Sequence, residues 1–282
     1  MNDRRLRPSL EELKAVCRKG DAEPFWISRF LIRPWSPYVS FVALRLGASP
    51  SQVTVLSAVL AVSAGVVTLW PATWSYVGSA LLTFGFFVLD HVDGELARFH
   101  QSRRTEPATG LNLSGKYLDR LVHYFQAPTL FLGISSGIAI TEGQPGWAVA
   151  GIVCALGSSG FPRFTASYDL LVAASRSTTE LNRAFLERAA GFSVAYGEGL
   201  LIRPFLFVPR STKELFAIGR QYVGFPGNLF VLSGALVIDG VRLPEATPYA
   251  TKLVVIAYAA VLFANLIYAT RKYFVLLQDV PE

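Results

Sequence analysis

Long uncharged runs dominate the pattern of hydrophobic and polar positions along this chain. Asp, Glu, Lys and Arg are all absent from residues 46–89, 121–141, 143–162, 221–238 and 253–270. A helix crosses the hydrocarbon core of a bilayer with about 20 residues. The first run is long enough for two such helices, divided by the turn-like "PATW" at 71–74. The pattern therefore predicts an all-α integral membrane protein with six transmembrane helices, at 51–70, 74–98, 111–139, 145–170, 223–238 and 247–275.

The N-terminal part of the chain follows a different pattern. "PSLEELKAVCRKG" predicts a short amphipathic helix that begins with a capping box formed by Ser9 and Glu12. Residues 25–46 are apolar, but Arg29, Arg33 and two prolines interrupt them. We therefore place this segment in the membrane interface, with a membrane-spanning helix as the alternative.

These patterns divide the chain into two parts. Residues 1–46 are expected to form a cytoplasmic or interfacial amphipathic segment, and residues 47–282 the six-helix transmembrane domain. The segment 177–220 is apolar in places but is interrupted by glycines, a proline and charges. We interpret it as a cytoplasmic or interfacial connection, because a seventh span would carry the C-terminal basic residues to the other side.

Composition and the placement of charge add an orientation. Only 16% of the residues are charged, against about 25% in an ordinary soluble domain. Basic residues concentrate on one side of the predicted helices, and the loops on the opposite side contain a single basic residue, Arg242. The positive-inside rule then places both termini in the cytoplasm, and we expect the cytoplasmic membrane of a prokaryote. The net charge of +6 is explained by this orientation, without a nucleic-acid partner.

Acidic residues appear abruptly at the end of the second predicted helix, in "LDHVDGELAR" at 89–98. A carboxylate next to hydrocarbon is costly and usually lines a functional site. At about 100° per residue, one arc of the helix holds Asp90, Asp93, Gly94 and Ala97. The two small residues leave space on this face for a flat group, and Arg98 can contact a phosphate or fix a carboxylate.

The next predicted helix has a matching polar face. "GKYLDRLVH" at 115–123 places Gly115, Asp119 and His123 four residues apart, one above the other on a helix. Two antiparallel neighbours would thus direct three carboxylates and an imidazole into one pocket, a set that suits Mg²⁺ or Mn²⁺. The alternative is a set of helix-end charges in contact with water.

These two stretches together resemble the signature of the CDP-alcohol phosphotransferases, D-x2-D-G-x2-A-R-x8-G-x3-D-x3-D. Seven of its eight fixed letters match. "LGASPSQVT" at 46–54 is also similar to the family's P-N-x-x-T entry to its first helix, with Ser51 where Asn is usual. The resemblance covers residues 45–135.

The resemblance implies an enzyme in which an alcohol displaces CMP from a CDP-linked substrate, in phospholipid or related lipid biosynthesis. Asp90, Asp93 and Asp119 would hold two Mg²⁺ or Mn²⁺ ions against the pyrophosphate. Gly94 and Ala97 would pack on the cytidine, and Arg98 would orient the phosphates.

The chain departs from the signature in two ways. Sixteen residues separate Arg98 from Gly115, where the family has eight. In this 99–114 loop, Arg103 and Arg104 form either a solvated basic turn or a recognition site for an anionic acceptor. The second departure is His123, which stands where the family uses its general base, an Asp. Histidine titrates near neutral pH and can do the same work, so we expect His123 to be the base.

The identity of the substrates stays open at this point. The donor is CDP-diacylglycerol with a polar alcohol as acceptor, or a soluble CDP-alcohol such as CDP-ethanolamine with a lipid acceptor. Arg163, near the end of the fourth predicted helix, is either a ligand for an acceptor phosphate or an interfacial anchor. The other expected partners are membrane lipids and, as an open option, a second copy in a homodimer. The alternative function is a catalytically degenerate family member that binds a nucleotide or a partner.

Overall fold

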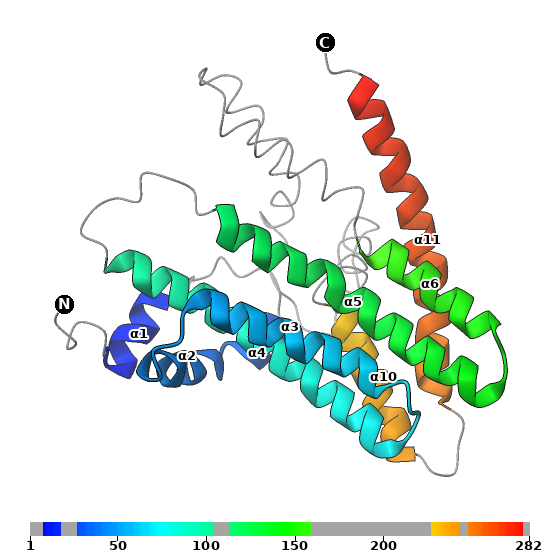
Figure 1. The fold of residues 1–282 in the computed structure, drawn as a ribbon, viewed down its shortest axis with the longest axis horizontal. Coiled ribbons are helices and arrows are strands. Elements are labelled where there is room, and N and C mark those ends of the chain that lie inside the picture. The colour runs from blue at the N-terminus through cyan, green and yellow to red at the C-terminus, as the bar shows by residue number, and fades with distance from the viewer. Residues whose placement is uncertain (1–7, 18–26, 104–112, 160–226, 243–247, 279–282) are drawn as a thin grey trace, which may run out of the picture.

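The computed structural model describes residues 8–17, 27–103, 113–159, 227–242 and 248–278, and these residues form helices and no strand (Figure 1). The elements are α1 (Leu10–Cys17), the π-helical η3 (Ser28–Ile32), α2 (Ser36–Arg45), α3 (Pro50–Val67), α4 (Thr73–Ser102), α5 (Leu113–Glu142), α6 (Gly146–Ser158), α10 (Gly227–Arg242) and α11 (Tyr249–Gln278). The predicted all-helical class is thus confirmed for the described part of the chain.

Two of the described helices, α3 and α4, are long and apolar enough to cross a membrane. Shorter apolar helices occur at Gly146–Ser158 and at Tyr249–Ala264. Each of the six predicted membrane helices overlaps a helix of the structure, although the part of the fourth beyond Ser159 lies outside the described residues. Association with a membrane is therefore supported by two helices.

Local signals in the sequence fix where the N-terminal helices begin. Ser9 caps α1, because the Glu12 N–H donates to Ser9 Oγ over 3.1 Å. At the start of α3 the capping box is complete: the Gln52 N–H donates to Ser49 Oγ over 3.3 Å, and the Ser49 N–H to Gln52 Oε1 over 2.8 Å. The start of α3 is thus defined by its own side chains.

Helix α3 packs against both α4 and α5, α10 packs against α4, and α6 joins α5 to α11 (Figure 1). The contact between α3 and α5 is so close that only glycine fits. A Cβ on Gly133 would lie 2.0 Å from the carbonyl oxygen of Gly65, and a Cβ on Gly65 would lie 2.5 Å from that of Thr129. We call this contact the α3–α5 seam. It joins the two helices along their later turns.

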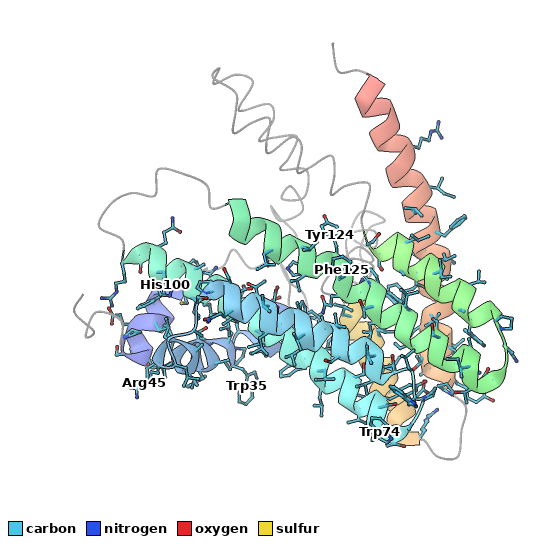
Figure 2. The ribbon with its side chains drawn as sticks, viewed as in Figure 1. Trp35, Arg45, Trp74, His100, Tyr124 and Phe125 are labelled. Carbon is cyan, nitrogen blue, oxygen red and sulfur yellow. The ribbon has the colours of Figure 1, made fainter. Side chains whose placement is uncertain are left out.

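Large aromatic side chains are exposed at both ends of the α3–α4 pair. Trp70 and Trp74 flank the turn between the two helices, and Trp35 precedes α2. Figure 2 shows Trp74 at the end of the pair that lies away from α2. Exposed tryptophans at two levels are typical of the two interfaces of a membrane, and they fit either orientation of the helices across it.

Candidate functional site

Three residues that the sequence singled out come together between α4 and α5. Asp90 of α4 and both Asp119 and His123 of α5 each offer a ligand atom within 4.8 Å of the others. His123 Nε2 lies 3.1 Å from Asp90 Oδ1 and 3.4 Å from Asp119 Oδ1. We call these three residues the acid–histidine cluster. It forms because the four-residue spacing on α5 stacks Asp119 and His123 on one face, opposite Asp90.

The donor set of this cluster fits a divalent metal ion. Two carboxylates and an imidazole supply oxygen and nitrogen ligands that Mn²⁺ accepts, while Mg²⁺ favours the carboxylates. The Asp119 side chain is 45% exposed, whereas that of Asp90 is only 14% exposed. The cluster is therefore accessible from the side of Asp119, so an ion and a ligand can reach it there.

Asp93 lies apart from the cluster, one helical turn further along α4. Its Oδ2 accepts a hydrogen bond of 2.6 Å from Thr54 Oγ1, which also lies 3.0 Å from the Pro50 carbonyl oxygen. Asp93 is 8% exposed. The beginning of α3 thus orients this carboxylate. The periodicity of the sequence does not pair the two residues, although Thr54 is the Thr of the stretch "PSQVT".

The small residues of the same α4 stretch differ in what lies over them. A Cβ on Gly94 would lie 3.3 Å from Arg98 Nη1, so the Arg98 guanidinium folds back over Gly94. Ala97 is exposed. The space that Gly94 leaves is therefore next to a flat cation, which suits the recognition of a phosphate.

Glu95 was not assigned a role by the sequence, yet it is the most deeply buried acid of this stretch, at 1% exposed. Its carboxylate accepts hydrogen bonds from Ser36 Oγ over 2.7 Å and from Ser40 Oγ over 2.6 Å. Glu95 is about 140° around α4 from Asp90, so it faces α2 instead of the cluster. The available signal was the pair of serines four residues apart in an otherwise apolar segment.

Helix α1 packs against the same part of α4 that carries Glu95. The Cys17 thiol donates to the Glu95 carbonyl oxygen over 3.6 Å. Burial, together with the negative charge of Glu95, raises the pKa of Cys17 to about 11. Arg103, at the end of α4, is ion-paired with Glu12 of α1 and lies 5.2 Å from the centre of the Phe99 ring. The N-terminal helices are thus held onto the C-terminal end of α4 by polar contacts.

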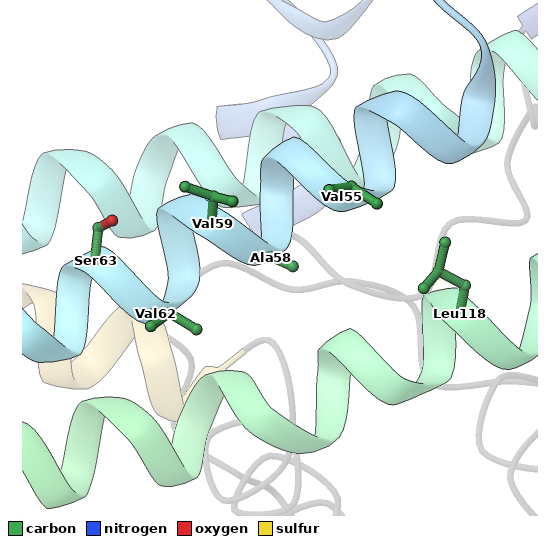
Figure 3. A pocket seen from close by; sticks show the side chains of 6 residues that line it. All are labelled: Val55, Ala58, Val59, Val62, Ser63 and Leu118. Carbon is green, nitrogen blue, oxygen red and sulfur yellow. The ribbon is translucent and has the colours of Figure 1, made fainter.

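An apolar groove runs between α3 and the first part of α5, where the two helices separate (Figure 3). Its volume is about 330 Å³, and it is lined by Val55, Ala58, Val59, Val62, Ser63 and Leu118. Leu118 directly precedes Asp119 of the cluster, and Val55 directly follows Thr54. An apolar surface thus begins beside the polar site.

His91 follows Asp90 on α4, and its Nδ1 lies 3.0 Å from the Phe87 carbonyl oxygen. Arg104, Arg163 and the 177–220 connection lie outside the described residues.

Comparison of the whole chain with models of known protein families and with curated proteins gives no match.

Proposed function

We propose that this protein is a membrane enzyme that transfers a phosphatidyl or related phospho-alcohol group from a CDP-linked donor to an alcohol, with release of CMP. The observation that carries the proposal is the meeting of Asp90, Asp119 and His123 from two helices. These residues belong to the stretch that resembles the CDP-alcohol phosphotransferase signature. We place six helices across the membrane, with the site and both termini on the cytoplasmic side.

The acids of the site would hold Mg²⁺ or Mn²⁺. Asp90 and Asp119 each keep a carboxylate oxygen that is not directed at His123, and Thr54 fixes Asp93 one turn away. A bound divalent ion would neutralise the charge of the donor's pyrophosphate. Arg98, folded over Gly94, is placed to donate to a phosphate oxygen.

His123 is the proposed base. With the metal held by the carboxylates and not by His123, the lone pair of His123 Nε2 takes the proton of the acceptor hydroxyl. The hydroxyl oxygen forms a bond to the phosphorus that carries the lipid or alcohol group. The bond from this phosphorus to the bridging oxygen breaks, and CMP leaves with the electron pair. The imidazolium that forms is hydrogen-bonded to Asp90 and Asp119, which already lie within reach of Nε2.

The apolar groove supports a lipid among the substrates. It begins next to Asp119 and follows the exposed apolar side of α3, so a lipid can reach the site from the membrane while its head group lies at the cluster. This arrangement favours CDP-diacylglycerol as the donor or a diacylglycerol as the acceptor.

The test measures CMP release by the purified protein in detergent micelles with Mg²⁺ or Mn²⁺. The two arms use CDP-diacylglycerol with a series of polar alcohols, and CDP-ethanolamine with diacylglycerol. Asp90→Asn and Asp119→Asn should each lower turnover at least about 100-fold, since general base and metal contributions are of that size. Glu11→Gln, at the exposed Glu11 of α1, is the matched control and should be fully active.

His123 separates this proposal from its alternative. His123→Ala should abolish turnover while CMP still binds, and His123→Asp should recover part of it because it restores the family residue. A protein that binds CMP in calorimetry but releases none from either donor is instead a degenerate nucleotide-binding relative. Normal turnover by both Asn variants would refute the metal site.

A further inference from the structure

Gln126 is a buried amide with no hydrogen-bond partner among the described residues. It is 2% exposed, and both Nε2 and Oε1 are inaccessible and unpaired. A glutamine amide offers two N–H donors and a carbonyl acceptor, and burying these groups unpaired is unfavourable. Such a group needs a partner that the described part of the chain does not supply.

The position of Gln126 connects it to the acid–histidine cluster. It follows His123 by three residues on α5, so it lies about 4.5 Å further along the helix axis than His123. It follows Asp119 by seven residues, so the two side chains are only about 20° apart around the helix. The same face of α5 therefore carries a metal ligand, the base and this amide in succession. Gln126 is the deepest of the three, toward the middle of the helix.

Two of the other buried polar groups without a partner, both hydroxyls, differ in kind from this amide. Thr83 and Ser135 also have unpaired hydroxyls, but a Ser or Thr hydroxyl can turn to the carbonyl oxygen of its own helix one turn earlier. Ser135 also faces α6, because its Cβ would be 2.5 Å from a Cβ on Gly151. Gln126 has neither explanation and shares its face with the site.

We propose that Gln126 binds the glycerol backbone of a diacylglyceride substrate, with Nε2 donating to an ester carbonyl oxygen. This inference rests on the proposed function, in which the phosphate of the lipid lies at Asp90 and Asp119. The ester carbonyls of a glyceride follow its phosphate within a few bonds, on the membrane side, where Gln126 lies. An ester carbonyl only accepts hydrogen bonds, so it matches the N–H donors, whereas an ether oxygen is a poor acceptor.

The experiment compares ester-linked and ether-linked forms of one CDP-lipid, CDP-dioctanoylglycerol and CDP-dioctylglycerol, in detergent micelles. Binding is measured by calorimetry and CMP release by kcat/KM. The natural protein should prefer the ester-linked form about threefold to tenfold, the size of one neutral hydrogen bond. In Gln126→Leu the two forms should become equal, and Ser135→Ala should keep the preference of the natural protein.

Stability distinguishes ligand binding from a structural role of Gln126. Because Leu removes unpaired buried polar atoms, Gln126→Leu should unfold at the same or a higher Tm than the natural protein. Equal binding of the two lipids by the natural protein, or a preference that survives in Gln126→Leu, would overturn the assignment. If neither lipid releases CMP but the natural protein alone prefers to bind the ester form, the proposed reaction fails and the role of Gln126 stands.

Discussion

Replacing both Ser36 and Ser40 by Ala should destabilise the protein strongly, because the buried Glu95 carboxylate would lose both of its side-chain donors. The two hydrogen bonds are 2.7 and 2.6 Å long, and all three residues are at most 1% exposed. A hydrogen bond to a charged group contributes about 1.5–3 kcal/mol. The double variant should therefore lose about 3–6 kcal/mol of unfolding free energy.

The origin of this loss can be tested by removing the charge as well. Most of the cost comes from a buried carboxylate left without partners, and replacing a whole buried polar set with apolar groups is often nearly neutral. Adding Glu95→Met to the double variant should therefore restore most of the stability. Glu95→Met alone should lower the unfolding free energy by less than the double serine variant does, because an unpaired buried hydroxyl is less unfavourable than an unpaired buried carboxylate.

The assay is denaturant unfolding in detergent micelles, followed by far-ultraviolet circular dichroism. Ser51→Ala is the matched control, since Ser51 is exposed at the start of α3, and it should change the unfolding free energy by less than about 0.5 kcal/mol. If the triple variant is no more stable than the double variant, the uncompensated carboxylate is not the cause and the reasoning fails.

Two further predictions concern other contacts. The pKa of Cys17 is raised to about 11 by burial, so thiolate is scarce at neutral pH. A maleimide should leave Cys17 unmodified in the folded protein and label it in the Ser36→Ala, Ser40→Ala variant; rapid labelling of the natural protein would contradict this. Gly133→Ala should lower the unfolding free energy by about 1–3 kcal/mol through overpacking at the α3–α5 seam. Gly146→Ala should leave it nearly unchanged, because no atom lies within 4 Å of the new Cβ. Thermal unfolding of the two variants measures the difference.

The sequence predicts the helices well because their signals are local. Uncharged length, the turn at 71–74 and the capping residue Ser9 each act within a few neighbours, and the structure has helices at the positions that they indicate. The facing of Asp90 and His123 also follows from helical periodicity plus the short distance between the two helices in the chain. The helix positions need no knowledge of distant contacts, whereas the facing of Asp90 and His123 requires that two helices adjacent in the chain are also neighbours in space.

The partners of the other acids could not be predicted in this way. Thr54 and Asp93 are 39 residues apart, and Ser36 and Glu95 are 59 apart. Such pairings depend on how α2 and α3 pack on α4, which periodicity does not specify. Gln126 could not be predicted for a different reason: a single amide in an apolar run has no distinguishing pattern until its burial and its lack of partners among the described residues are known.

The α3–α5 seam has a consequence for the permeability of the membrane. In the proposed placement, a polar cluster and a lipid-accessible groove occupy the cytoplasmic half of the protein, where they admit ions and water. Beyond them, the backbone contact of Gly65 with Gly133 leaves no room even for a methyl group. Between these two helices the protein can therefore hold charged groups next to hydrocarbon without opening a path for protons to the opposite side.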